Sequence, residues 1–303
     1  MNQKPPFADP SPETRAWIER ETGGRVIRID PAQRSSTSVH HIVIEGPTGA
    51  PAEFALRRFT DTSRLGSDPW YAPASEARVL ELLRPTSVLA PRLHASDVEG
   101  NECDSPALLM EWFTGKVLEL RDQIEPALEE LALHLVTIHQ SVAAPEKSKL
   151  PRYQRYYRPA ELETPPWSSR PDVWEKVFRI VSAPEPESSS TFIHRDYHVG
   201  NTLWSRGRLT GVIDWTTGAW GPPAIDVARM RQNLAYRWGI AAAEMFLLRY
   251  EALSHRALED RIYWELVDCA DSLTDVSEPM SQSREHALER FDQFVAGLVD
   301  QFS

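Results

Sequence analysis

Apolar and polar residues alternate along the first part of the chain in a pattern typical of antiparallel strands. Three segments are predicted as strands on this basis, at residues 25–30, 38–45 and 53–59, because a period of two is expected where one face of a strand is buried. Ser11 and the proline after it suit the start of a preceding helix, and a Gly-Gly pair suits its end. The pattern therefore predicts a helix followed by a meander of strands.

Later segments carry apolar residues three and four positions apart, which is the spacing of helices with one buried face. Two further strands are predicted among them, at 87–95 and 106–111. The segment 148–190 is rich in proline and aromatic residues, and both a substrate lid and a packed connector fit its composition. Helices are expected at residues 73–83, 125–140, 171–181, 228–235, 241–253, 262–273 and 285–302.

Composition excludes several classes of protein. The chain has 303 residues, 41% of them hydrophobic and 25% charged, which is typical of a globular protein large enough for two lobes. Its net charge of −11 argues against nucleic acid as the main partner. The N-terminus lacks the apolar run of a signal peptide, and no stretch is long enough for a membrane helix. The two cysteines have no metal-ligand spacing, so we expect a cytoplasmic protein without a membrane partner.

The most informative stretch is 191–204, in which two short apolar strands flank a polar loop. Asp196 and Asn201 lie five residues apart in this loop, the spacing of the kinase catalytic loop H-R-D-L-x-x-x-N. A further apolar strand ends in Asp214. In phosphoryl transfer, Asp196 would act as the base toward a hydroxyl, while Asn201 and Asp214 would hold Mg²⁺, which prefers oxygen ligands. Chance occurrence of the spacing is the alternative, and the flanking strands disfavour it.

At these residues the sequence resembles the aminoglycoside phosphotransferase and choline kinase-like family of small-molecule kinases. The resemblance covers most of the chain and is most specific from His194 to Asp226, where the run Gly221–Ala228 is similar to the family's segment after the magnesium-binding aspartate. It implies an α+β, two-lobed fold like that of protein kinases, with a small antiparallel-sheet lobe at 1–112 and a larger, mostly helical lobe at 113–303. It also implies transfer of the terminal phosphate of ATP or GTP to a hydroxyl, with Mg²⁺ as cofactor.

The resemblance also implies which residues meet the nucleotide. Arg57 stands where protein kinases carry the lysine of Val-Ala-Ile-Lys. Glu76, near the start of the following helix, is the candidate to pair with it, and a surface glutamate is the alternative. The loop between the first two strands has no glycine; the Ser36 hydroxyl is a candidate to donate to phosphate, and an ordinary polar hairpin loop is the alternative. Backbone groups of Glu111 and Phe113, where the chain leaves the sheet, are expected to bind the purine.

Two residues are expected to support the catalytic loop: His194 by bracing it and Asp226, by resemblance, by hydrogen-bonding its backbone. The acceptor site is expected between this loop and the C-terminal helices. Residues 240–303 carry 13 acidic side chains and five arginines, a net charge of −8, which favours a cationic acceptor such as an amino-sugar. A solvated acidic surface is the alternative. Three carboxylates, three and four positions apart, are the candidate acceptor ligands: Asp268, Asp271 and Asp275.

A protein kinase and a catalytically inactive nucleotide-binding module are the competing functions. Only 11 residues separate Asp214 from Asp226 and no Ala-Pro-Glu follows, so there is no room for a long activation loop. The inactive module is disfavoured because the candidate base and both candidate metal ligands are present. The acceptor stays open among aminoglycosides, macrolides, choline-like alcohols and sugars, including sugars attached to proteins.

Overall fold

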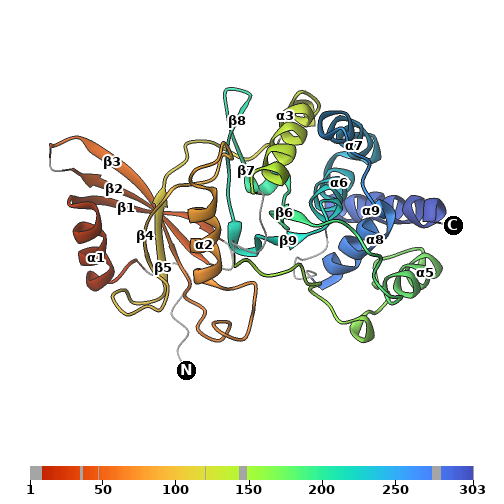
Figure 1. Ribbon diagram of the computed structural model, residues 1–303, viewed down its shortest axis with the longest axis horizontal. Helices are drawn as coiled ribbons and strands as arrows, with labels where there is room; N and C mark the ends of the chain where they lie inside the picture. The colour runs from red at the N-terminus through yellow and green to blue at the C-terminus, as the bar shows by residue number, and fades with distance from the viewer. Residues whose placement is uncertain are drawn as a thin grey trace. The chain divides into compact units, whose positions relative to one another are not determined.

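The computed structural model describes residues 9–34, 37–46, 48–119, 121–142, 149–274 and 281–302 (Figure 1). Two compact units can be distinguished by the contacts within each of them. One unit combines Met1–Gly115 with the short segment Thr210–Thr217, and the other combines Lys116–Leu209 with Gly218–Ser303. The first unit therefore contains Asp214, although this residue is far along the chain from the sheet.

The first unit is built on a five-stranded antiparallel sheet, and the alternating pattern correctly predicts it. The strand order is β1-β2-β3-β5-β4, and every neighbouring pair is antiparallel. Helix α1 lies beside the sheet (Figure 1). The elements are α1 Pro12–Thr22, β1 Arg25–Arg34, β2 Ser38–Glu45, β3 Pro51–Arg58, α2 Pro73–Leu83, β4 Leu93–Asp97 and β5 Ala107–Glu111.

Helix α1 has the start and the end that its sequence predicts. The Ser11 hydroxyl accepts the N–H of Thr14 as an N-cap, and Gly23 ends the helix at a φ of 65°. Trp17 and Ile18 are buried in the core of this unit, and each such side chain contributes about 1.5–3 kcal/mol by leaving water. Their neighbours in the core are Val26, Ile42, Ile44, Leu56, Cys103, Ala107 and Leu109.

The strand predicted at 87–95 is shorter than expected, because β4 begins only at Leu93. Pro91 has no N–H to give to a strand ladder. Before it, the carbonyl of Leu89 accepts the N–H of Val212 at 2.7 Å. Leu89, in the first part of the predicted strand, is therefore hydrogen-bonded to the segment that precedes Asp214.

Helices dominate the second unit, as the apolar spacing predicts. Two short strands, β6 and β9, pair with each other, and β7 with β8 forms a hairpin whose second strand ends in the first unit. Among the described helices, none combines the length and apolar character that a bilayer crossing requires. The helices are α3 Arg121–Gln140, α5 Pro171–Val181, α6 Ala224–Trp238, α7 Ile240–Ser254, α8 Arg261–Asp271 and α9 Gln282–Phe302. The strands and short 3₁₀ turns are η1 Pro159–Glu161, β6 Thr191–Ile193, η2 Val199–Asn201, β7 Thr202–Ser205, β8 Arg208–Val212, η3 Trp215–Thr217, β9 Ala219–Gly221 and η4 Ser272–Thr274.

The aromatic segment before the catalytic loop makes the contacts of a packed connector. The Ser168 hydroxyl and the Trp174 ring N–H both donate to the buried carboxylate of Asp292 on α9, at 2.7 Å and 2.9 Å. The Tyr153 N–H and the carbonyl of Trp220 on β9 are joined at 2.7 Å. These bonds fix the start and the middle of the segment within the second unit.

Gly211 on β8 is required because an aromatic ring lies directly over it. A Cβ at this position would lie 2.3 Å from the Cδ2 atom of Phe113, which is far inside van der Waals contact. The absence of a side chain therefore allows Phe113 to pack on β8, the strand that leads to Asp214.

We expect Gly211→Ala to destabilise the protein by about 1–3 kcal/mol, the usual cost of overpacking. The measurement is the free energy of unfolding in urea. Gly297→Ala in α9 is the matched control, because a Cβ there meets nothing within 4 Å and alanine favours a helix. The double variant Gly211→Ala/Phe113→Ala should recover part of the loss. An effect of Gly211→Ala no larger than that of the control would show that the ring does not constrain this strand.

Candidate active site

A buried arginine joins two carboxylates in the first unit. The Arg57 guanidinium on β3 lies 2.8 Å from Oε1 of Glu76 on α2 and 2.9 Å from Oδ1 of Asp214. Arg57 and Glu76 are 7% and 2% exposed. The ion pair expected between Arg57 and Glu76 is therefore present, and the surface alternative for Glu76 is excluded.

The electrostatics of this trio depend on its burial. Burial raises the pKa of Glu76 to about 7; the Arg57 charge opposes the rise and the Asp214 charge adds to it. Burial also works against the charged form of Arg57, yet the carboxylates of Asp214 and Glu76 raise its pKa above the ordinary value. The three groups therefore depend on one another for their charge states.

Asp214 has the backbone and the exposure of a ligand-binding carboxylate. It lies just after β8 at a φ of 65°, in a left-handed conformation that aspartate tolerates better than most residues. The Thr216 hydroxyl donates to its Oδ1 at 2.6 Å, and about a third of the side chain is exposed, at 33%. Its partners thus orient the carboxylate while solvent still reaches it.

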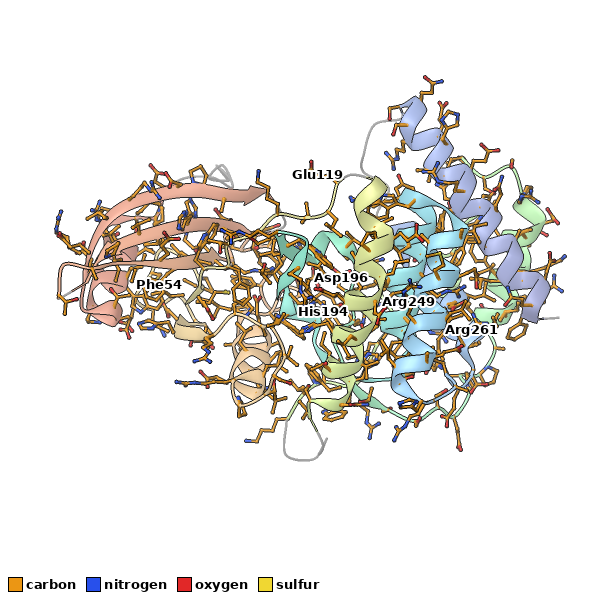
Figure 2. The ribbon with its side chains drawn as sticks, turned by 90° about the horizontal axis from the view of Figure 1, so that it is seen from above. Phe54, Glu119, His194, Asp196, Arg249 and Arg261 are labelled. Carbon is orange, nitrogen blue, oxygen red and sulfur yellow. The ribbon has the colours of Figure 1, made fainter. Side chains whose placement is uncertain are left out.

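In the second unit, a buried carboxylate holds the catalytic loop. Asp226, in the first turn of α6, accepts the N–H of His194 at 2.8 Å and that of Arg195 at 2.6 Å. Its third partner is Nε2 of His139 on α3, at 3.1 Å. Hydrogen bonding to the loop backbone is the role expected of Asp226 by resemblance. Figure 2 shows His194 and Asp196 on the loop, beside α3.

His139 on α3 has a structural role that the apolar spacing of its helix does not indicate. Its ring bonds to the Tyr250 hydroxyl at 2.7 Å and to Asp226 at 3.1 Å. It is 8% exposed. His139 therefore connects α3 and α7 to the carboxylate that holds the loop.

Asp196, the candidate base, is fixed at both carboxylate oxygens. Arg229 Nε donates to Oδ1 at 2.8 Å, and Asn201 Nδ2 donates to Oδ2 at 3.0 Å. His198 Nε2 lies 3.5 Å from Oδ2. Burial by itself would raise the pKa of the Asp196 carboxyl, but the Arg229 guanidinium, with a smaller contribution from His198, holds it well below its usual range. Asp196 is therefore an ionised carboxylate that remains 24% exposed.

The two loop histidines stabilise backbone. His194 Nδ1 accepts the N–H of Asp196 at 3.2 Å, which matches the bracing role expected of it. His198 Nδ1 accepts the N–H of Gly200 at 3.0 Å and caps η2. Both contacts fix the turn in which Asp196 and Asn201 lie.

Arg195 supports the loop from its other side, a role that the sequence does not indicate. Its φ is 72°, a conformation that costs a non-glycine residue on the order of 1–3 kcal/mol. Its guanidinium lies over the rings of Tyr156 and Tyr153, at 3.5 Å and 4.9 Å from their centroids, and donates to the carbonyl of Gln154. The bond from its N–H to Asp226 and these contacts offset the strain and fix the connector against the loop.

The candidate acceptor residues Asp268 and Asp271 on α8 are buried and face the protein's own arginines. Asp271 lies 3.8 Å from Arg195 and accepts the N–H of Tyr156 at 2.7 Å. Burial raises its pKa to about 6, against the opposing charge of Arg195. Burial raises the pKa of Asp268 to about 7, against the opposing charge of Arg229. Arginines thus supply the positive charge that the sequence analysis assigned to a cationic acceptor.

Two of the candidate nucleotide-binding residues, Glu111 and Phe113, lie where the chain leaves β5. The N–H of Glu111 donates to the carbonyl of Arg92 at 2.9 Å, so this donor is already used within the sheet. Phe113 lies two positions beyond the end of β5, and its purine-binding role stays a prediction. Ser36 and Asp275 lie outside the described residues.

Asn201 in the second unit and Asp214 in the first each offer an oxygen of the kind that Mg²⁺ prefers. Asn201 directs its amide nitrogen at Asp196, so the amide oxygen is the atom left for a metal ion. Asp214 offers a partly exposed carboxylate. Within the described ranges no three His, Cys, Asp or Glu residues form a metal-binding group, and Mg²⁺ commonly needs only one or two protein carboxylates beside phosphate oxygens.

Comparison with known proteins adds a family and a fold. The sequence signature of the phosphotransferase enzyme family matches residues 48–264, and a search of curated proteins found no match. A candidate aminoglycoside phosphotransferase from Ralstonia eutropha JMP134 has a TM-score of 0.64 at 14% identity, over 95% of this chain and 98% of its own. A thermostable mutant of the aminoglycoside phosphotransferase APH(4)-Ia, bound to ADP and hygromycin B, has 0.60 at 14%, over 95% and 97%.

Macrolide 2′-phosphotransferase type I has a TM-score of 0.60 at 16% identity, over 91% of this chain and 94% of its own. At such identities, structural likeness establishes the fold alone. The fold is the two-lobed kinase-like fold, as the sequence analysis expected.

The pKa of Asp268 predicts a pH dependence of stability with a definite sign. The folded pKa of about 7 lies above the ordinary value of 3.8, so the folded state binds more protons between these values. The stability contributed by this group is present below pH 4 and is lost as the pH rises through 7. The free energy of unfolding of the wild type, relative to Asp268→Asn, should therefore fall by up to about 4 kcal/mol between pH 4 and pH 8.

Urea unfolding of both proteins across this pH range measures the difference. Asp300→Asn, on an exposed position of α9, is the control for the loss of one carboxylate. A difference that rises with pH would mean that Asp268 is stabilised as a carboxylate by Arg229 more than it is destabilised by burial.

Proposed function

This chain belongs to the phosphotransferase enzyme family, and we propose that it moves the terminal phosphate of a nucleoside triphosphate to a hydroxyl of a small molecule. The observation that carries the proposal is the Asp196 carboxylate, which is partly exposed and fixed by Arg229, Asn201 and His198. An oriented carboxylate beside the attacking hydroxyl is what phosphoryl transfer requires of the protein.

The remaining roles follow from the contacts of each residue. Asp196 accepts the hydrogen bond of the acceptor hydroxyl and orients its oxygen toward the phosphate. Asn201, through its amide oxygen, and Asp214 are the proposed ligands of Mg²⁺, which would supply positive charge to neutralise the phosphate oxygens. Arg57, held by Glu76, is assigned to the nucleotide phosphates. These residues contribute mainly by position and charge, because phosphoryl transfer needs little covalent chemistry from the protein.

A small molecule is favoured over a protein as the acceptor because the chain after Asp214 is short. Helix α6 begins at Ala224, ten positions after Asp214. The residues between them form the 3₁₀ turn Trp215–Thr217 and strand β9. This leaves no segment long enough for a phosphorylated activation loop.

ATP or GTP is proposed as the phosphate donor, and an amine-bearing alcohol as the acceptor. The similar APH(4)-Ia mutant binds ADP and hygromycin B. This supports a nucleotide as the phosphate donor and an aminoglycoside-like compound as the acceptor. The net charge of −11 also favours a cation over an acid. Asp268 and Asp271 supply no direct support, since Arg229 and Arg195 already face them. Amine recognition would have to come from other groups.

We expect Asp196→Ala to lower phosphate transfer by about 10²–10⁴-fold while the protein still binds nucleotide, because the lost group contacts the acceptor hydroxyl. Asp214→Ala should also weaken nucleotide binding that depends on Mg²⁺, because it removes a carboxylate ligand. The measurements are calorimetric binding of an ATP analogue with and without Mg²⁺, and consumption of ATP with a pool of hydroxyl compounds. Asp300→Ala is the matched control on an exposed carboxylate. Wild-type turnover by folded Asp196→Ala would refute the assignment of the base.

A further inference from the structure

One oxygen of the candidate base is held by a residue that no motif includes. Arg229 Nε donates to Oδ1 of Asp196 at 2.8 Å. The arginine lies in α6, 33 positions after the aspartate, and each of the two side chains is 24% exposed. The pair therefore lies at a surface that solvent reaches, where the base must meet its acceptor.

Arg229 is itself held in place from the opposite side. Its Nη1 donates to the Ser272 hydroxyl at 3.1 Å, and that hydroxyl donates to the carbonyl of Asp268 at 3.0 Å. The Asp268 carboxyl acts on Arg229 electrostatically. An arginine fixed at two of its nitrogens keeps one orientation, which distinguishes it from a flexible surface ion pair.

The other oxygen of the base is also occupied. Asn201 Nδ2 donates to Oδ2 at 3.0 Å, and His198 Nε2 lies 3.5 Å from the same atom. A carboxylate offers about four lone-pair directions. Oδ2 thus has two protein groups beside it, whereas Oδ1 has Arg229. The lone-pair direction left to accept a hydroxyl is therefore on Oδ1, next to Arg229.

From this arrangement we infer that Arg229 is a positioning residue for phosphate transfer: it fixes the plane of the Asp196 carboxylate and selects Oδ1 as the oxygen that receives the acceptor hydroxyl. The inference rests on the proposed role of Asp196 as the base. Misplacing a reacting group by about 1 Å can reduce a rate by on the order of 10²-fold. Loss of Arg229 therefore lowers kcat while the nucleotide still binds.

Three substitutions separate positioning from charge. Arg229→Gln removes both, while Arg229→Lys keeps the charge but has a single ammonium in place of the planar fork that reaches Asp196 and Ser272 together. Ser272→Ala leaves Arg229 bonded to Asp196 but frees its other end. We expect kcat to fall about 10²-fold in Arg229→Gln, to recover only partly in Arg229→Lys, and to fall less in Ser272→Ala. KM for ATP should stay within about twofold throughout, since nucleotide binding does not involve Asp196.

The experiment follows consumption of Mg²⁺-ATP by the full chain in a pool of hydroxyl-bearing metabolites and antibiotics. Arg237→Gln is the matched control, because it removes an exposed arginine from the same helix at its last turn. Circular dichroism and ATP-analogue binding verify that each variant is folded. Added guanidinium ion at non-denaturing concentration should restore part of the activity of Arg229→Ala, which a purely structural role would not allow.

Two of the following outcomes would overturn the role of Arg229, and a third would overturn the proposed function. If the wild type transfers phosphate and Arg229→Gln matches Arg237→Gln in kcat, Arg229 does not position the base, and the proposed function stands. If Arg229→Lys restores full kcat, charge alone is responsible and the inference is wrong. If the folded wild type neither binds ATP nor consumes it with Mg²⁺, the proposed function itself fails.

Discussion

A single buried carboxylate, that of Asp226, sets the geometry on which the proposed chemistry depends. It has no exposed surface, so as an anion it would be costly without donors. The donors are the N–H groups of His194 and Arg195 and the ring of His139. Because two of them are backbone groups of the catalytic loop, satisfying the carboxylate also fixes the loop to α6 and α3. The direction of the Asp196 side chain follows from that attachment.

A second set of charged side chains supports the catalytic loop, and its acidic members come from the C-terminal part of the chain. Asp268 and Asp271 do not point to bulk solvent; they face Arg229 and Arg195, respectively. Asp271 lies 3.8 Å from Arg195, and the Asp268 carbonyl is joined to Arg229 through the Ser272 hydroxyl. The acidic residues of α8 therefore hold the two arginines near Asp196. Through these arginines they also reach the connector residues that pack on the loop.

What the sequence predicts well is what short-range patterns determine. The strands of the sheet follow from alternation, whereas the Arg57–Glu76 pair is expected from the resemblance to kinases. Arg229 and His139 could not be found in this way, because their partners lie 33 and 87 positions away and meet them only through helix packing. Charge counting likewise identified Asp268 as important but placed its counter-charge in a ligand. The sign of a local charge run cannot reveal which distant arginines compensate it.

Transfer of phosphate to a hydroxyl can be measured most directly by mass spectrometry of acceptor pools incubated with the wild-type protein and ATP that carries an isotope label in its terminal phosphate. Aminoglycosides, macrolides, choline-like alcohols and sugars form separate pools, each with and without Mg²⁺. The account predicts a labelled phosphate ester in at least one pool, formed only when Mg²⁺ is present, with amine-bearing alcohols preferred. Folded protein that binds no nucleotide, and leaves the labelled phosphate on ATP in every pool, would contradict it.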